Sequence, residues 1–145
     1  MATVNDIISS KGNQVWTIGK EVTVLQAAQL MNEHKIGALV VMEGDRLAGM
    51  FTERDVLRRV VGEQRPPATT SVADVMTSEV ACCTLQTPLE EARMAMKNMR
   101  IRHMPVMDEG GHLRGLLSIG DLNAFEAASQ EQTIFWMQEY MYGRV

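Results

Sequence analysis

Several features that mark large classes of protein are scarce or missing in this sequence. Cysteine occurs only at Cys82 and Cys83, and because adjacent cysteines rarely bridge, a disulfide framework is excluded and a reducing compartment fits. The pair also lacks the two further ligands that a zinc site needs, so we expect both to be small, buried, apolar residues. No apolar run approaches the roughly 18 residues of a membrane span, and the N-terminus has no apolar core of signal-peptide length. These absences predict a cytoplasmic protein with no membrane partner.

An excess of positive charge is also missing. The formal net charge is -4 at pH 7, whereas a protein that binds a phosphate backbone usually carries a concentrated positive face. A local basic run does exist, and we interpret it as one solvated helix edge. We therefore expect no nucleic-acid partner. The basic run consists of Lys97, Arg100, Arg102 and His103.

No recognisable set of catalytic residues is present. The three histidines, His34, His103 and His112, stand apart, and no Cys or Ser lies in a nucleophile motif. The HExxH and GxxxxGK[ST] motifs are both missing. We therefore expect no enzymatic activity, no catalytic cofactor and no metal site, and we expect His34 and His112 to be surface residues.

The sequence contains an internal repeat, which indicates a fold built from two similar units. Ala27 matches Ala92 and Met31 matches Met96, in each case 65 residues later. Beyond the next turn the spacing becomes 66, because the second copy has one extra residue in that turn, and turns tolerate insertions. The matched pairs at this second spacing are Leu47 with Leu113, Gly49 with Gly115, Thr52 with Ser118, and Asp55 with Asp121.

Each copy is predicted to run β-α-β-β-α, which makes the fold mixed α/β (α+β). The first helix of each copy has an apolar face at helical spacing, and a Gly-containing turn between two apolar runs predicts a hairpin. The two helical faces are Val24, Ala27, Ala28 and Met31 in the first copy and Leu89, Ala92, Met96 and Met99 in the second. The strands are predicted at residues 14–17, 38–42 and 46–51, and at 80–83, 104–107 and 112–117, with final helices starting near Glu53 and Ile119.

The same pattern divides the chain. A Pro pair and small polar residues within residues 62–71 mark a linker. We predict a first repeat with its N-terminal segment at residues 1–65, a second repeat at 66–130 and a helical tail at 131–145, whose apolar face packs on the body or on a partner subunit. Because neither half is large enough to bury a core comfortably alone, the two sheets are expected to pack face to face about a pseudo-twofold axis.

Five short stretches carry a family likeness. They are VADVMT at residues 72–77, LEEA at 89–92, IRHMPV at 101–106, GLLSIGDL at 115–122 and, in the first copy, GMFTERD at 49–55. With them the repeat resembles the CBS domain, named for cystathionine β-synthase. The whole chain resembles a stand-alone tandem pair of the bacterial type, a Bateman module, over roughly residues 3 to 125.

The GMFTERD stretch and its copy admit two interpretations. In the first, Thr52 is a helix N-cap and Asp55, three residues later, completes a capping box, which needs no ligand. In the second, the free N–H groups of the helix start attract a phosphate, the hydroxyl adds a donor, and the carboxylate accepts from ribose hydroxyls. Arg54 adds positive charge in the first copy, whereas the second copy has Gly120 at that position. The two interpretations are compatible.

The resemblance to CBS domains favours the ligand and implies which residues hold it. By position, it assigns ribose and phosphate contacts to the two helix starts, and the adenine to apolar clefts near the segment before the second strand. Both copies keep the hydroxyl and the acid, so we expect two competent clefts. The helix-start residues are Thr52, Arg54, Asp55, Ser118 and Asp121. The cleft residues are Ile36, Gly37 and Ala38, then Arg102, His103 and Met104, with Ile18 and Cys83 near the ends of the first strands.

The leading functional hypothesis is a regulatory sensor that binds an adenine nucleotide such as AMP, ATP or NAD(H), with S-adenosylmethionine as a further adenosyl ligand. Its output would be a shape change passed to an unidentified regulated protein or across a homodimer, the assembly that the resemblance implies. The alternative is a protein–protein interaction module with vestigial nucleotide clefts, acting through a Met-rich face or the terminal helix. RNA or DNA binding is a third possibility that the acidic balance disfavours. It would use Arg93, Lys97, Arg100 and Arg102.

Overall fold

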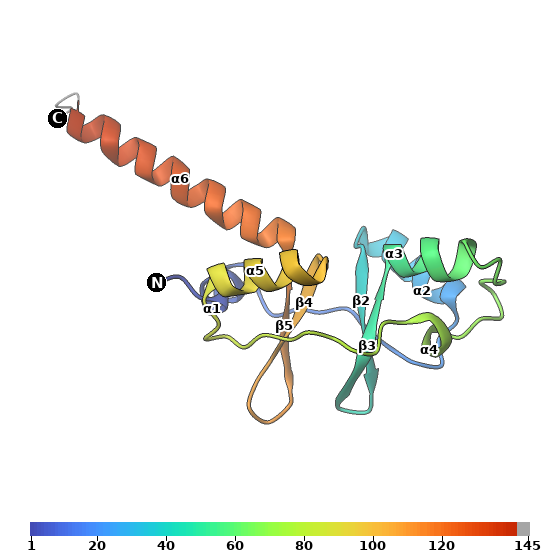
Figure 1. Ribbon diagram of the computed structural model, residues 1–145. Helices are drawn as coiled ribbons and strands as arrows, with labels where there is room; N and C mark the ends of the chain where they lie inside the picture. The colour runs from blue at the N-terminus through green and yellow to red at the C-terminus, as the bar shows by residue number, and fades with distance from the viewer. Residues whose placement is uncertain (142–145) are drawn as a thin grey trace.

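The first half of the protein is a three-stranded sheet with helices packed on it (Figure 1). The structure is a computed structural model, and it describes residues 1–141. β1 (Thr17–Gly19) lies parallel to β2 (Ala38–Glu43), and β2 pairs antiparallel with β3 (Arg46–Thr52). The first four residues of β2 are all buried. Both faces of this strand are covered, which explains why its sequence is a continuous apolar run.

The second half has a two-stranded sheet of β4 (His103–Met107) and β5 (Leu113–Ser118). Here the predicted strand at residues 80–83 is wrong, since only Cys83 forms a single parallel bridge, to Val106. The corresponding prediction at residues 14–17 is displaced, because β1 starts at Thr17. The two halves differ for a physical reason: the Val40 amide donates to the Trp16 carbonyl at 3.2 Å in the first half, and the matching residue in the second half is Pro105, which has no N–H to donate.

The first helix of each repeat, α2 (Val24–His34) and α5 (Leu89–Met99), packs its apolar face on its own sheet. Thr23 caps α2 by accepting from the Gln26 amide at 3.1 Å. Both helices end in a left-handed residue, Lys35 at φ 54° and Arg100 at φ 55°. The predicted faces are largely buried, but Met99 is exposed, because it is the last residue of α5 and faces the cavity described below rather than the core.

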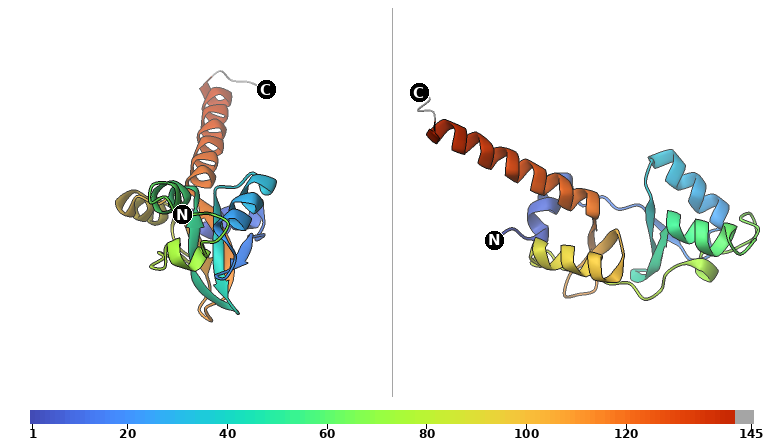
Figure 2. Two further views of the ribbon diagram at one scale, coloured as in Figure 1. Left: turned by 90° about the vertical axis from the view of Figure 1, so that its right-hand side faces the viewer. Right: turned by 45° about the horizontal axis from the view of Figure 1, so that its top comes forward.

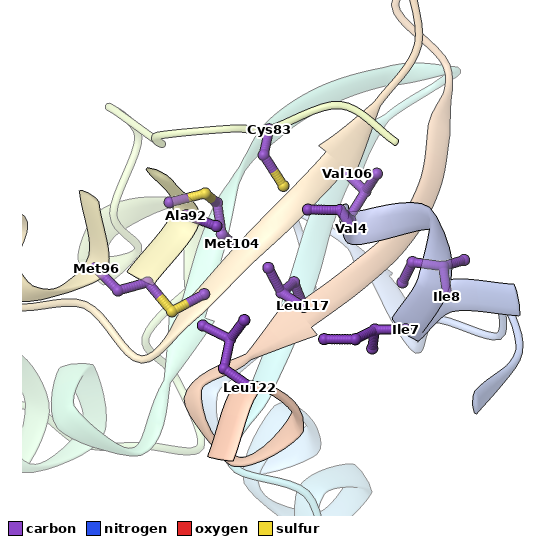
Figure 3. Close-up of a cluster of buried hydrophobic side chains, with 10 residues drawn as sticks. All are labelled: Val4, Ile7, Ile8, Cys83, Ala92, Met96, Met104, Val106, Leu117 and Leu122. Carbon is purple, nitrogen blue, oxygen red and sulfur yellow. The ribbon is translucent and has the colours of Figure 1, made fainter. Parts of the chain in front are cut away.

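The two short helices that precede the sheets are exchanged between the halves. α1 (Val4–Lys11) supplies Val4, Ile7 and Ile8 to the core of the second half (Figure 3), whereas α4 (Val72–Val75) packs on the first half. Burying each such side chain stabilises the fold by roughly 1.5–3 kcal/mol. The predicted boundary at residue 65 separates the two repeats along the chain. It does not separate the two hydrophobic cores, because each core contains a short helix from the other side of that boundary.

The sheets meet at an apolar layer and are related by a pseudo-twofold axis. Ala38, Val40 and Met50 of the first sheet are buried against a group that includes Leu113 and Leu116 of the second. Matching backbone hydrogen bonds recur in both halves. The Glu53 amide donates to the Gly37 carbonyl at 3.0 Å, and the Ile119 amide donates to the Arg102 carbonyl at 2.9 Å.

The closing helices of the repeats differ in length. In the first half, α3 (Glu53–Asp55) continues as a π-helical stretch at Val56–Val61. In the second half, α6 (Ile119–Met141) is one continuous helix that projects from the body (Figures 1 and 2), because no Gly or Pro interrupts residues 121–142. The predicted tail is therefore the end of α6, and its described apolar side chains Ile134 and Met137 do not pack on the body. Tyr142 and the rest of residues 142–145 lie outside the described part.

The cysteines and two of the histidines differ in how far their side chains are buried. Cys83 is buried as predicted, but the prediction for Cys82 is wrong, because its side chain is exposed. His112 is exposed and bonded to Asp108, whereas His34 is half-buried and stacks on Trp16 with ring centroids 3.5 Å apart. Within residues 1–141, no helix is long and apolar enough to cross a membrane.

Candidate functional site

A cavity of about 740 Å³ lies between the two halves. This volume falls within the range of small-molecule sites, roughly 300–1,000 Å³. Both helix starts open onto it, because Thr52 of the first half and Ser118 of the second are on its wall. Its apolar lining includes Met50 of β3 and Ile101. The remaining wall residues are Gly37, Glu53, Arg54, Asp55, Arg58 and Arg59 from the first half, Thr77, Glu79, Val80 and Ala81 from the connection after α4, and Met99, Arg102, His103, Ile119 and Gly120 from the second half.

The first helix start forms the predicted capping box. The Asp55 amide donates to the Thr52 hydroxyl at 3.3 Å, and the Thr52 amide donates back to Asp55 Oδ2 at 3.0 Å. Asp55 is only 5% exposed, so its carboxylate depends on internal partners. Its second oxygen, Oδ1, accepts from the Thr77 hydroxyl at 3.2 Å and lies 3.8 Å from Nε of Arg59. The carboxylate is therefore held rigidly at the edge of the cavity.

The second helix start repeats the box with a different environment. The Ser118 amide donates to Asp121 Oδ2 at 2.9 Å, and the Asp121 amide donates to Ser118 Oγ at 3.0 Å. Asp121 also forms an ion pair with Nζ of Lys11 at 2.7 Å, and it is not on the cavity wall. The capping interpretation thus holds for both copies, while the two acids are positioned differently with respect to the cavity.

Four arginines line the cavity and make it suitable for an anion. Arg59 is held by the Met76 carbonyl at 2.8 Å, and Arg54 donates to the Arg100 carbonyl at 3.0 Å. For the guanidinium groups of Arg58 and Arg102, no hydrogen bond or ion pair is found among the described residues. Guanidinium groups bind phosphate oxygens through pairs of N–H donors. Glu53 and Glu79 are the exposed acids of the wall.

His103 lies half-buried on the wall at the start of β4. Burial lowers the pKa of its imidazole, and the neighbouring Arg102 lowers it further, against the opposing effects of Asp121 and Glu53. The ring is therefore neutral near pH 7, where it can donate one hydrogen bond and accept another.

The cavity brings together seven of the thirteen predicted site residues: Gly37, Thr52, Arg54, Asp55, Arg102, His103 and Ser118. Three of the others, Ala38, Met104 and Cys83, are buried in the apolar layers. Ala38 and Met104 each follow a wall residue, Gly37 and His103, and neighbouring residues of a strand point to opposite faces. Burial raises the pKa of the Cys83 thiol to about 12, so this group is inert as a nucleophile. Ile18 and Ile36 pack against the first core, and Asp121 faces Lys11.

Sequence reasoning missed several wall residues. Arg58 lies one helical turn after Arg54, so helical spacing alone places both on one face, and this signal was available. Thr77 and Glu79 reach the cavity only through the path of the chain after α4, and no local pattern reveals that path. Among residues 1–141, no group of three or more His, Cys, Asp or Glu side chains is placed to hold a metal ion.

The comparisons with known proteins agree with this architecture. The family model of the CBS domain matches residues 4–62 and 72–127. The chain is 34% identical to the mitochondrial CBS domain-containing protein CBSX3 of Arabidopsis thaliana, over 97% of this chain and 72% of that protein. It is also 34% identical to CBS domain-containing protein YhcV of Bacillus subtilis (strain 168), over 84% of each. The chain belongs to the CBS-domain family and is a pair of CBS domains, a type of regulatory module.

Solved structures show the same fold. A protein with CBS domains from Burkholderia ambifaria MC40-6 has a TM-score of 0.85 and 40% identity, and the match covers 89% of this chain and 96% of that one. The CBS domain pair of protein MJ0100, solved in complex with 5′-methylthioadenosine and S-adenosyl-L-methionine, has a TM-score of 0.78 and covers 89% of this chain and 98% of that one. Its identity is 19%, so this likeness concerns the fold alone.

Proposed function

We propose that the protein is a regulatory sensor that binds an adenine nucleotide in the cavity between its two CBS domains and has no catalysis of its own. The observation that carries this proposal is the wall of that cavity. It combines both helix starts, with Thr52, Ser118 and the buried acid Asp55, and four arginines that surround the same space. Hydroxyl, carboxylate and guanidinium groups are the partners that a ribose phosphate requires.

The charges favour a phosphate-bearing ligand within the adenosyl class. AMP, ATP and NAD(H) carry negative phosphates, which Arg58 and Arg102 can meet without giving up a partner among the described residues. S-adenosylmethionine instead brings a sulfonium cation, which four guanidinium groups would repel. The adenosyl ligands of the MJ0100 pair are bound by that protein, and they support an adenosyl ligand here only at the level of the shared fold.

The output of the sensor is a change of shape or assembly. A ligand shifts a protein between two states only by binding one of them better, and a cavity between two halves is a place where closure alters that affinity. We propose that the chain acts as a homodimer and passes this change to a regulated protein. Sedimentation velocity with and without ATP tests the assembly, and a monomer at micromolar concentration would contradict it.

The binding proposal is tested by isothermal titration calorimetry on protein stripped of nucleotide. AMP, ATP, NAD, NADH and S-adenosylmethionine are titrated separately to millimolar concentration. We expect saturable binding of at least one phosphate-bearing ligand, and the Asp55→Ala variant should lose tenfold or more of the affinity. Asp45→Ala, a change of the same type in the exposed hairpin turn, is the matched control. If none of the five ligands binds to the unmodified chain, the sensor function is wrong.

A protein–protein interaction module is the second candidate, and the end of α6 favours it. Ile134 and Met137 are 55% and 58% exposed on a helix that leaves the body (Figure 1), and exposed apolar side chains grouped in this way mark interaction surfaces. Under this alternative, a partner would bind the chain equally well with and without nucleotide. The two functions are therefore separated by measuring partner affinity at saturating ATP.

A further inference from the structure

We infer that Lys11 occupies the second nucleotide cleft from within the chain, so that each chain binds one ligand rather than two. This inference rests on the proposed function and specifies its stoichiometry. The ammonium of Lys11 contacts Asp121 Oδ2 at 2.7 Å, the carboxylate to which a ribose hydroxyl in this cleft would donate. The ligand is thereby restricted to the cleft at Asp55.

The pseudo-twofold axis makes the two clefts comparable residue by residue. The Val4 amide of α1 donates to the Thr87 carbonyl at 2.9 Å, and the Val72 amide of α4 donates to the Val22 carbonyl at 2.8 Å. α1 and α4 thus occupy equivalent places on opposite halves. The chain segments that follow them are therefore the two structures that can border the clefts.

These two segments take different courses. α4 has 4 residues and stops at Val75, after which the chain extends past Asp55 and supplies Thr77 and Glu79 to the cavity wall. α1 has 8 residues, and its extra turn carries Lys11 to Asp121 instead. No residue between 11 and 15 is on the cavity wall. Asp55 therefore borders the cavity, whereas Asp121 is paired with Lys11.

The contacts of Lys11 explain why it stays in place. Its Nζ donates to Asp121 Oδ2 at 2.7 Å and to the Leu116 carbonyl at 2.9 Å, so the ammonium bridges the helix start and the strand before it. Asp121 is 22% exposed in this pair, compared with an almost fully buried Asp55. A ribose at Asp121 would have to displace a charged donor at 2.7 Å. At Asp55 the hydrogen-bond donors are neutral hydroxyl and amide groups, and the nearest charged group, Nε of Arg59, is 3.8 Å away. The first cleft is therefore the easier one to occupy.

The number of ligands per chain tests the inference, measured by native mass spectrometry and calorimetry on the full chain with ATP as the probe. We expect one ATP for the unmodified chain, two for Lys11→Met, none for Asp55→Ala and one for the double variant Lys11→Met/Asp55→Ala. Lys20→Met is the matched control, because Lys20 forms an exposed ion pair with Glu43 at 2.8 Å far from Asp121. It should bind one ATP with affinity within twofold of the unmodified chain.

Each result decides between distinct ideas. Two ATP per unmodified chain would overturn the role of Lys11 and leave the sensor function intact. A double variant that binds no ATP, although its circular dichroism spectrum is native, would have the same meaning. Weaker ATP binding by Lys11→Met at an unchanged stoichiometry would instead make Lys11 a phosphate ligand and overturn the inference. Absence of binding to every variant would remove the sensor function itself. If Lys11→Met unfolds, Lys11→Gln keeps a hydrogen-bond donor without the charge, and two ATP are again expected.

Discussion

The Thr77 hydroxyl donates a hydrogen bond to Oδ1 of Asp55 at 3.2 Å, which joins the segment after α4 to the helix start of the first half. The same segment also pairs with β3 through the backbone, because the Thr77 amide donates to the Met50 carbonyl at 2.9 Å and the Met50 amide donates to the Thr77 carbonyl at 2.8 Å. The carboxylate on the cavity wall is therefore oriented by a residue from the far end of the linker. Its position therefore depends on the segment after α4 being docked on the first half.

Replacing Thr77 with Val should lower stability by about 1.5–3 kcal/mol, the usual value of a hydrogen bond to a charged group, because the acceptor is the buried Asp55 carboxylate. Asp55 keeps its bonds to Thr52, so the fold should persist. Urea denaturation followed by circular dichroism measures the change, and Thr69→Val in the exposed linker serves as the control. Equal midpoints for the two variants would show that the Thr77 side chain does not support Asp55.

The equivalent glycines Gly49 and Gly115 should respond differently to alanine. A Cβ at Gly49 would lie 2.5 Å from the Thr77 carbonyl oxygen, which is backbone, whereas a Cβ at Gly115 would lie 3.0 Å from Cδ1 of Ile8, the end of a flexible side chain. Overpacking of a buried site usually costs about 1–3 kcal/mol, so Gly49→Ala should be the more destabilising change. Thermal unfolding of both variants tests this, and an equal or larger loss for Gly115→Ala would contradict it.

Arg58 and Arg102 should contribute to phosphate binding. Changing either to Gln removes one charge-assisted contact, which is worth about 1.5–3 kcal/mol and corresponds to roughly tenfold or more in the dissociation constant. ATP affinity should fall accordingly and should depend less on salt concentration, while any binding of S-adenosylmethionine should not weaken. Calorimetry at two ionic strengths provides the measurement, with Arg46→Gln on an exposed strand end as the control. An unchanged ATP affinity in both variants would place the phosphates elsewhere.

Stability should fall as the pH decreases below about 6.5, the pKa of histidine in an unfolded chain, because of His103. Burial and Arg102 lower the pKa of His103 in the folded protein, in spite of Asp121 and Glu53, and Lys11 adds to the lowering. Between the two pKa values the unfolded chain binds the proton and the folded chain does not, so stability rises with pH across that window and is level above it. His103→Gln should flatten this part of the profile in urea titrations between pH 5 and 7.5. Parallel profiles for the two proteins would contradict the prediction.

The parts of the structure that depend on local sequence were predicted correctly. The two hairpins, the long helices α2 and α5 and both capping boxes follow from patterns a few residues long, such as Thr52 followed by Asp55. The repeat itself predicted the pseudo-twofold axis, because equal sequences fold into equal units.

The remaining features depend on which segments meet in space. The apolar spacing within α1 indicates that Ile7 and Ile8 are buried. It does not indicate whether these side chains pack on the first half or on the second. Lys11 and Asp121 are 110 residues apart in the sequence. No local pattern therefore predicts their ion pair, which is the feature that makes the two helix starts different. The absence of a strand at residues 80–83 could have been predicted from the sequence, because Pro105 has no N–H to donate to such a strand.

The placement of α1 also has a consequence for how the chain is made. Residues 4–8 are synthesised before residues 83–122, yet all of their buried members belong to one core, which includes Leu122. During most of translation this helix has no surface to cover, and an apolar segment without its surface is prone to aggregate. Helix α1 is therefore made early and packed late, and a ribosome that stalls before residue 122 leaves α1 without the complete core that it joins in the folded protein.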